Sequence, residues 1–373
     1  PAEETVHLRL RIDGLMRTAA TLDKHAYKLL LSRIKLLSNM KLNIHNMSQD
    51  GRFTVKIGDD EIEIRTSIVP GNYGESIVMR ILNPDTISLS LEKLGMHPKI
   101  LEVVKKELAR PNGMILNTGP TGSGKTTALY AFLKHIYRPG IKIITIEDPI
   151  EYHLPGITQT QVDKTKGYTF LEGLRAALRQ DPDVIMIGEI RDEETASTAI
   201  NAALTGHVVL STLHTNNAAG TFPRLVDLKI NPHTIGSAVR LSMAQRLVRT
   251  LSPNCKVEAS LTGKNLEIAK TAMANLQRKG FDTKGLDPLK VYTVKEGCKD
   301  KEGSGYKGRI GVFEGILVDA NMEEFLKTSP GEREIKNFSE KQNIMTIQED
   351  GLLKVLQGQT DIKELARVVD LNL

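Results

Sequence analysis

Near its start, the chain alternates apolar and polar residues in short segments that predict strands around a helix. Residues 6–12 alternate as in a half-buried strand, and the Asp13-Gly14 pair after them is typical of a hairpin turn. Asp23 is a candidate N-cap, because apolar residues recur at helical spacing from residue 26 to residue 37. A strand hairpin followed by an amphipathic helix is therefore expected.

A second hairpin is predicted after this helix. Residues 53–57 and residues 62–68 alternate on either side of a Gly-Asp-Asp turn sequence at 58–60. Residues 77–82 form one more strand-like segment. We therefore expect residues 1–82 to form a small α+β domain.

The hydrophobic pattern changes after a linker at residues 83–92, which contains proline, aspartate and serine. From about residue 97, helical stretches alternate with short apolar runs, which is typical of a parallel sheet covered by helices. The runs are residues 114–116, 143–146, 184–187 and 208–210. The pattern predicts an α/β nucleotide-binding core over residues 93–250.

The last segment, residues 251–373, differs in composition from the core. Residues 254–311 are rich in glycine and lysine with few apolar runs, and the pattern becomes helical again from Met322. We expect an appended C-terminal subdomain that ends in helices.

Residues 119–126 carry the strongest chemical signal, the phosphate-loop pattern G-x-x-x-x-G-K-[ST]. A predicted strand at 113–117 precedes it and a predicted helix at 127–136 follows, which is the setting that the pattern requires. In such loops backbone N–H groups bind phosphate, the lysine (Lys125) reaches the β- and γ-phosphates, and the hydroxyl of Thr126 binds Mg²⁺. The residues expected to contact the nucleotide are Gly119, Pro120, Thr121, Gly122, Ser123, Gly124, Lys125, Thr126 and Thr127.

Acidic residues follow two of the predicted buried strands. Glu189 lies at the carboxyl end of its strand, where α/β proteins place ligand chemistry, so it is a candidate to contact Mg²⁺ or to orient the attacking water. The acids at 192–194 are explained by the dipole of the helix that follows them. Glu147, Asp148 and Glu151 end another strand, and their spacing favours a site over a solvated turn.

Two histidines, His207 and His214, bound the predicted strand at 208–213. A histidine beside an apolar strand is most often a core residue with its hydrogen bonds satisfied. Two histidines beside a nucleotide core can instead sense phosphate, and the spacing leaves both interpretations open.

Composition and charge narrow the possible classes of protein. Hydrophobic residues make up 40% of the 373 residues and charged residues 25%, which excludes disordered and fibrous classes. The net charge of +5 arises from mixed signs without a basic block. Aromatic residues make up 4% and there is no Trp, so nucleic-acid binding is not favoured.

Cysteine content and polarity bear on the compartment. Two cysteines, Cys255 and Cys298, cannot build a disulfide framework, and no signal-peptide pattern opens the sequence, so a reducing cytoplasmic setting is the default. Residues 195–223 lack charged side chains, but polar residues interrupt them too often for a bilayer. A buried core segment is expected there.

Four motifs together resemble one family, the secretion ATPases of type II secretion systems and type IV pili. The motifs are GPTGSGKTT, TIEDPIE, VIMIGEIRD and GHVVLSTLHT, in the order in which the family has them. The segments GYKGRIGVFE and TIQEDGLLKVLQGQT near the end resemble the assembly and export branch more than the retraction branch. The resemblance implies a RecA-like parallel-sheet core, a smaller PAS-like N-terminal α+β domain that lacks a strand before Pro1, and an appended C-terminal subdomain.

The resemblance also implies roles for single residues. Glu151 resembles the acid that activates the attacking water, and Glu189 resembles the Walker B acid that supports Mg²⁺ together with Thr126. His207 and His214 resemble the family's histidine box, which links the state of the γ-phosphate to subunit contacts. Arg65 and Arg80 of the first domain match family arginines that reach the nucleotide, although alternation alone places both on a solvated strand face.

Partners and cofactors follow from the same resemblance. They are ATP and Mg²⁺, a homohexamer, an inner-membrane platform protein and a cytoplasmic ring or linker protein, with no nucleic acid and membrane contact only through partners. This places the protein in the cytoplasm, peripheral at the inner membrane. Type II secretion and pilus assembly share every motif quoted, so the choice between them stays open.

Related motors often bind zinc with two C-x-x-C pairs, and this sequence departs from that pattern. The matching positions read Ser252-Pro253-Asn254-Cys255 and Cys298-Lys299-Asp300-Lys301, which leaves two of four ligands. We expect no zinc, and two thiols that are free or, if close, oxidisable.

Two alternatives belong to other functional classes. A nucleic-acid translocase would share the phosphate loop and a ring architecture, and it predicts stimulation by DNA or RNA. A non-hydrolysing module would use ATP only as a conformational ligand, although Lys125, Glu151 and Glu189 argue against it.

Overall fold

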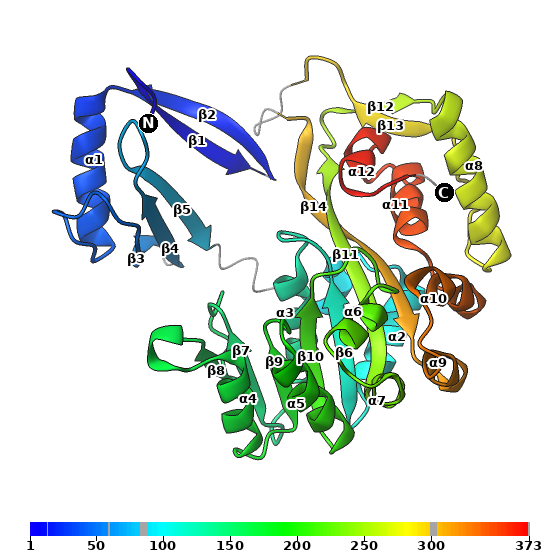
Figure 1. The fold of residues 1–373 in the computed structure, drawn as a ribbon. Coiled ribbons are helices and arrows are strands. Elements are labelled where there is room, and N and C mark those ends of the chain that lie inside the picture. The colour runs from blue at the N-terminus through cyan, green and yellow to red at the C-terminus, as the bar shows by residue number, and fades with distance from the viewer. Residues whose placement is uncertain (13, 59, 83–88, 299–303, 372–373) are drawn as a thin grey trace. The chain divides into compact units, whose positions relative to one another are not determined.

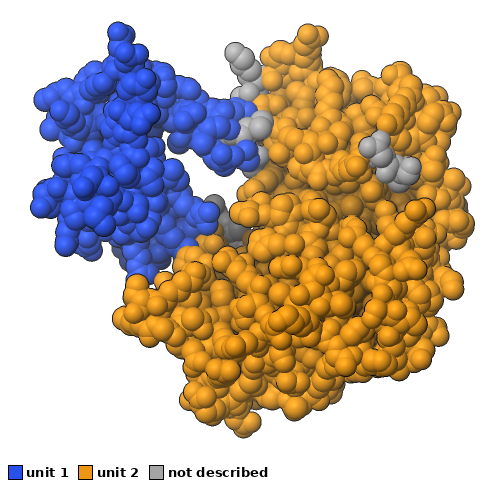
Figure 2. Space-filling model, in the orientation of Figure 1, with its two compact units in different colours: residues 1–88 blue, residues 89–373 orange. Residues whose placement is uncertain are grey.

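The computed structural model describes residues 1–12, 14–58, 60–82, 89–298 and 304–371. The chain divides into two compact units, Pro1–Ser88 and Leu89–Leu373 (Figure 2). The positions named in sequence analysis that lie outside the described residues are Asp13 and Asp59 of the two turns, 83–88 of the linker and 299–301 of the second cysteine motif.

The first unit has the elements that its alternation predicted (Figure 1). A two-stranded antiparallel sheet and a three-stranded antiparallel sheet, of strand order β3-β4-β5, lie on either side of one helix in the sequence. The elements are β1 (Val6–Ile12), β2 (Leu15–Leu22), α1 (Lys24–Leu37), β3 (Gln49–Ile57), β4 (Asp60–Val69) and β5 (Ser76–Leu82). The side chain of Asp23 caps α1 by accepting the N–H of Ala26 at 2.8 Å, as predicted.

A buried ion pair joins α1 to the segment before β5. Lys35 is 1% exposed, and its Nζ lies 2.7 Å from Oε1 of Glu75 and 2.7 Å from the carbonyl oxygen of Ile44. The second oxygen of Glu75 lies 2.7 Å from Nδ1 of His45. Because a buried charge is costly without a partner, removal of either Lys35 or Glu75 would destabilise this unit.

The second unit is built on a seven-stranded sheet of order β14-β11-β6-β10-β9-β7-β8. All neighbouring strands are parallel except β14, which is antiparallel to β11. The strands are β6 (Gly113–Thr118), β7 (Ile143–Glu147), β8 (Thr158–Gln161), β9 (Val184–Ile187), β10 (Val208–Leu213), β11 (Val239–Leu251) and β14 (Tyr306–Leu317). The predicted α/β class with a parallel-sheet core is confirmed.

Helices cover this sheet (Figure 1). The even-numbered side chains of β6, Met114 and Leu116, are fully buried in one apolar cluster with residues of α4, α5 and α7. Alternation sends Ile115 to the other face, where α3 contacts β6 and β10. The helices of this layer and its connections are η2 (Leu91–Leu94), α2 (Pro98–Leu108), α3 (Lys125–Ile136), η3 (Lys164–Lys166), α4 (Phe170–Leu178), α5 (Glu193–Leu204), α6 (Thr221–Asp227) and α7 (Pro232–Ala238).

The expected C-terminal subdomain, 251–373, is tied to the core sheet. The boundary expected at residue 250 falls inside β11, which pairs with β6 and, from Leu241 to Leu251, with β14. The remaining elements are β12 (Lys256–Ala259), α8 (Gly263–Arg278), β13 (Val291–Val294), α9 (Ala320–Leu326), α10 (Glu332–Ser339), η4 (Glu340–Gln342), α11 (Ile347–Leu356) and α12 (Ile362–Val368). Residues of α8, α11 and α12 form an apolar cluster with Val248 of β11 and Val312 of β14.

Cys255 and Cys298 are joined by a disulfide with a Cα–Cα distance of 5.7 Å. It lies at one end of the antiparallel β12–β13 pair, where Lys295 also donates its N–H to the carbonyl oxygen of Cys255 at 2.7 Å. Over the ranges that the structure describes, no group of three or more His, Cys, Asp or Glu side chains is arranged to hold a metal ion.

The uncharged stretch at residues 195–223 is a core segment, as predicted. It contains most of α5 and all of β10, and β10 is buried along its whole length. Among the described helices, none combines the length and the apolar character that crossing a bilayer requires.

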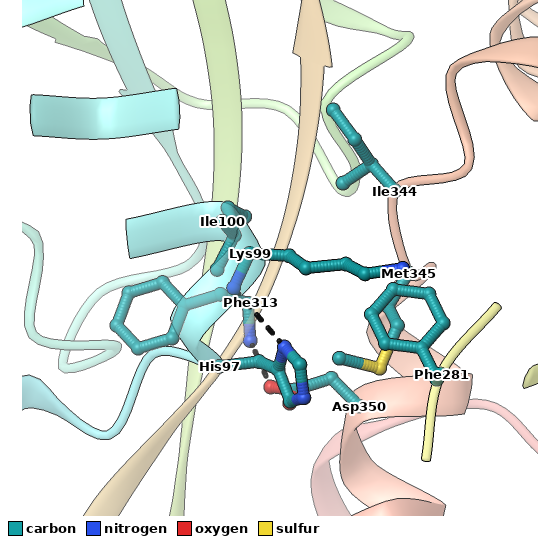
Figure 3. A pocket seen from close by; sticks show the side chains of 8 residues that line it. All are labelled: His97, Lys99, Ile100, Phe281, Phe313, Ile344, Met345 and Asp350. Atoms are coloured by element: carbon teal, nitrogen blue, oxygen red, sulfur yellow. Dashed lines mark hydrogen bonds between the residues drawn. The ribbon is translucent and has the colours of Figure 1, made fainter. Parts of the chain in front are cut away.

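The start of α2 packs against Phe281, which follows α8 in the sequence (Figure 3). The ring of His97 meets the ring of Phe281 edge-on at 5.0 Å between centroids, and Nζ of Lys99 lies 4.0 Å from the Phe281 centroid. Nδ1 of His97 accepts the N–H of Lys99 at 3.3 Å and caps α2. Asp350 of α11 lines the same small cavity and accepts the N–H of Phe313 at 2.8 Å.

Burial lowers the pKa of His97, an effect that nearby Asp350 opposes and Lys354 and Lys99 reinforce. As the pH falls below 6.5, the ordinary pKa of histidine, the unfolded state therefore binds more protons than the folded state, and the folded state loses stability.

We expect the melting temperature of His97→Asn to fall less than that of the wild type between pH 7.5 and pH 5.5, because asparagine keeps a capping acceptor but does not titrate. Equal losses in the two proteins would contradict this.

Candidate functional site

Four parallel strands of the second unit bring candidate residues to one edge of the sheet. Leu213 at the end of β10 is paired with Thr118 at the end of β6, and β9 runs beside β10. The phosphate loop follows β6, Glu189 follows β9 and His214 follows β10. Glu151 lies in the loop after β7, the next strand along.

The phosphate loop needs glycine at its first position because β11 lies against it. Gly119 has φ +148°, and a Cβ there would lie 2.6 Å from the carbonyl oxygen of Gln245 and 2.7 Å from Oγ of Ser123. Gly124, with φ +89°, precedes the first residue of α3, and a Cβ there would lie 2.8 Å from Nε2 of Gln245. The backbone can therefore turn tightly into α3 and present its N–H groups at the helix start.

Lys125, the first residue of α3, folds back over its own loop. Its Nζ donates to the carbonyl oxygens of Gly119 at 2.6 Å and Pro120 at 3.2 Å. Burial lowers the pKa of Lys125; nearby Glu189 counters this effect and Arg246 adds to it. Thr126 is exposed beside it.

Glu189 is held in place through its backbone and its side chain. Thr212 donates its hydroxyl to the carbonyl oxygen of Gly188 at 2.7 Å. The Glu189 carboxylate, 13% exposed, pairs with the guanidinium of Arg191 and lies 3.1 Å from Nε2 of His214. Sequence analysis did not single out Arg191, because a charged residue after a strand is usually solvated.

The three acids at the end of β7 and after it differ in their surroundings. Glu147 is 2% exposed and accepts hydrogen bonds from Tyr130, Thr145 and Gln159. Its carboxylate is therefore occupied within the fold, whereas Asp148 is exposed and Glu151 is half-buried. The structure therefore distinguishes Glu147, which is buried and bonded within the fold, from Glu151, which lies half-buried in the loop.

The two histidines lie at opposite ends of β10. His207 precedes Val208, which is paired with Gly113 at the start of β6, and its Nδ1 lies 3.0 Å from the carbonyl oxygen of Ala202. A strand rises about 3.3 Å per residue, so the length of β10 separates His207 from the phosphate loop. Of the two, only His214 lies at the edge that carries the loop in this chain.

Arg65 and Arg80 are directly paired in the first unit, on neighbouring strands β4 and β5. Arg52 of β3 is the partner of Arg65 on the other side, so three arginines form a row across the sheet. Like charges directly opposite one another destabilise a sheet, and Nε of Arg65 also lies 3.5 Å from Oε1 of Glu63, which offsets part of this charge. Sequence alternation could not find Arg52, because it does not fix which residues of three strands are paired.

Arg246, like Arg191 and Arg52, was not identified from the sequence. It lies on β11 just past the level of Thr118, and its guanidinium donates to the carbonyl oxygen of Asn216 at 2.6 Å. A Cβ on Gly119 would lie 3.0 Å from Nη1 of Arg246. Arg246 thus lies between the turn after His214 and the first residue of the phosphate loop. Burial lowers the pKa of its guanidinium.

The sequence model of a family described as "Type II/IV secretion system protein" matches residues 1–367. The chain belongs to this family. It is 42% identical over 366 residues to the type II secretion system ATPase E of Vibrio cholerae, covering 98% of this chain and 70% of that protein. It is 40% identical over 371 residues to the type IV pilus assembly ATPase PilB of Thermus thermophilus, covering 99% of this chain and 40% of that protein.

Solved structures agree with the assignment to the type II/IV secretion family. The pilus retraction motor PilT with bound ADP aligns with a TM-score of 0.64 at 25% identity, covering 99% of this chain and 93% of that chain. The ATPase DotB of Legionella pneumophila aligns with a TM-score of 0.66 at 20% identity, covering 98% and 91%, and supports the fold. The family resemblance stated from the motifs is confirmed, and with it the secretion and pilus-assembly ATPase assignment in general.

The contact between Gly119 and β11 can be tested by stability. We expect Gly119→Ala to lower the melting temperature more than Gly140→Ala does. Both positions have positive φ, which costs about 1–2 kcal/mol for an L-residue, but a Cβ on Gly140 meets no atom within 4 Å. Equal losses in the two variants, measured by thermal denaturation, would mean that the loop does not depend on this contact.

Proposed function

We propose that this protein is a hexameric, Mg²⁺-dependent ATPase that powers type IV pilus assembly or type II secretion through an inner-membrane platform protein. The observation that carries the proposal is the convergence of the phosphate loop, Glu189 and the Glu151 loop at one edge of the sheet. Support comes from relatives 40–42% identical that are named secretion or pilus-assembly ATPases.

ATP would bind with its phosphates at the start of α3. The contacts are backbone N–H groups of residues 119–127 and the ammonium group of Lys125. Lys125 now donates to two loop carbonyls, so it would exchange these hydrogen bonds for phosphate oxygens. Because its ammonium group is already partly desolvated, binding of an anion costs little additional burial of charge.

The donor set fits Mg²⁺, which prefers oxygen ligands and retains several waters. The exposed hydroxyl of Thr126 and the carboxylate of Glu189 would hold it, the latter through water or directly. When bound, the ion neutralises charge on the β- and γ-phosphates.

Hydrolysis would use Glu151 as the general base. Its carboxylate accepts a proton from the water that attacks the γ-phosphorus, the bond from that phosphorus to the β–γ bridging oxygen breaks, and ADP and phosphate leave. Glu147 is not suited to this step, since three donors already occupy its carboxylate. His214 would sense this chemistry through Glu189, whereas His207 is left outside the phosphate site of its own chain.

The first unit would complete the site by bringing Arg65 and Arg80 to the phosphates, where guanidinium groups stabilise transition-state charge. Closing and reopening of this unit around a hexameric ring would convert hydrolysis into displacement of the platform protein. A cytoplasmic ring or linker protein would join the assembly, peripheral at the inner membrane.

Substitution of two residues tests the chemistry. Glu151→Gln should lower the ATPase rate by about 10²–10⁴-fold while ADP affinity stays within about twofold, because only proton transfer is lost. Lys125→Ala should abolish turnover through loss of phosphate contacts. The matched control is Glu267→Gln, an exposed acid on α8, which should hydrolyse ATP at the wild-type rate. Hydrolysis by Glu151→Gln at the control's rate would refute the assignment of the base.

Assembly can be tested by the ATPase rate per chain as a function of protein concentration, with Mg²⁺ present and nucleic acid absent. A rate per chain that rises with concentration is expected, because arginines of a closed ring complete the site. A flat rate from a monomer, identified by light scattering of the same samples, would exclude the hexamer requirement. Stimulation by DNA or RNA would instead favour the translocase alternative.

A further inference from the structure

Glu147 is a buried carboxylate that the proposed chemistry does not use. Its Oε2 accepts a hydrogen bond from the Tyr130 hydroxyl. Its Oε1 accepts hydrogen bonds from the Thr145 hydroxyl and, at 3.0 Å, from Nε2 of Gln159. A buried carboxylate requires such donors, since an unpaired one is costly. Burial raises the pKa of the Tyr130 hydroxyl, and the negative charge of Glu147 raises it further. The hydroxyl therefore remains protonated and serves as the donor.

The same donors hold the loop that carries Glu151. Nε2 of Gln159 donates to the carbonyl oxygen of Tyr152 at 2.9 Å, and Oε1 of Gln159 accepts the N–H of Leu154 at 2.6 Å. The Tyr130 hydroxyl lies 3.4 Å from the same Tyr152 oxygen. The amide of Gln159 thus uses two donor hydrogens and its acceptor at once, which fixes its orientation.

Tyr130 places this network on the helix of the phosphate loop. It lies on α3, which begins at Lys125, while Gln159 lies on β8 and Glu147 ends β7. The rings of Tyr130 and Tyr152 also meet edge-on at 6.5 Å between centroids. One buried network therefore joins the phosphate-binding helix to the residue next to Glu151.

We propose that Tyr130, Glu147 and Gln159 are positioning residues that fix the Glu151 loop relative to the phosphate loop. The catalytic part of this inference rests on the proposed role of Glu151. Gln159 holds the backbone groups of residues 152 and 154 directly, and Tyr130 and Glu147 hold Gln159 and the loop in that arrangement. Loss of any member therefore lets the base sample more positions and reach the attacking geometry less often. Phosphate contacts lie elsewhere on α3 and are unaffected.

Two readouts test the proposal in the 373-residue chain. Tyr130→Phe should lower kcat by about 10- to 100-fold with the affinity for ADP, measured by calorimetry, within about twofold of wild type. Hydrogen exchange of the backbone amides of residues 150–157 should become several-fold faster. The matched control is Tyr168→Phe, which also removes a hydroxyl bound to β8, at Thr160 Oγ1, but touches neither Glu147 nor the loop. Its kcat and loop exchange should match wild type.

Gln159→Met provides a second variant, at a half-buried position and with a side chain of similar length that cannot make these hydrogen bonds. It should reproduce both effects of Tyr130→Phe. Loop exchange at the wild-type rate in both variants would overturn the network itself, and faster exchange with unchanged kcat would overturn its role in positioning. Failure of the proposed function can be distinguished from failure of this inference. Hydrolysis by Glu151→Gln at the wild-type rate would refute the role of Glu151 as the base, whereas the hydrogen-exchange result tests the network independently of that role.

Discussion

The alignment of β6 with β10 at their carboxyl ends is the constraint on which the candidate site depends. Thr118 is fully buried, donates its hydroxyl to the carbonyl oxygen of Leu213 at 2.9 Å and accepts the N–H of Thr215 at 2.8 Å. These bonds fix the two strand ends at the point where the phosphate loop begins. A slip in this register would separate the phosphate loop from His214, because the loop begins directly after β6 and His214 directly follows β10.

A half-buried side chain connects this edge to the C-terminal helices. Glu314 of β14 accepts the N–H of Ala218, close to His214 in the sequence, at 2.7 Å, and the N–H of Ile347 at the start of α11 at 3.0 Å. One rigid carboxylate therefore sets both the turn after β10 and the position of α11. The segment after residue 250 therefore belongs to the same compact unit as the sheet, and the pairing of β14 with β11 also joins the two.

Local signals in the sequence were sufficient for much of this architecture. The short apolar runs predicted β6, β7, β9 and β10, and the cap at Asp23 marked the start of α1. The phosphate loop was found because its glycines, lysine and threonine occur at fixed spacing between a strand and a helix.

The site features that could not be predicted from the sequence depend on contacts between segments that are far apart in the chain. The acids Glu147 and Glu151 look alike in sequence, and the burial of Glu147 beside its donors Tyr130 and Gln159 is visible only in the structure. The spacing of the two histidines showed that they bound a strand, but it did not show that Nε2 of His214 lies 3.1 Å from the Glu189 carboxylate. Arg246 became visible only because β11 lies against β6.

The disulfide between Cys255 and Cys298 closes a loop whose ends are 43 residues apart in the sequence, and that loop contains α8. In the chain-entropy account, a covalent link of this span removes about 4 kcal/mol of conformational freedom from the unfolded chain. Where the bond is reduced, α8 is still held by apolar side chains, such as Ala269 and Ala272, and by the buried ion pair of Lys279, at its end, with Glu349 of α11. The loop would then unfold and refold as a local unit, at a cost set by the packing of α8 rather than by the central sheet.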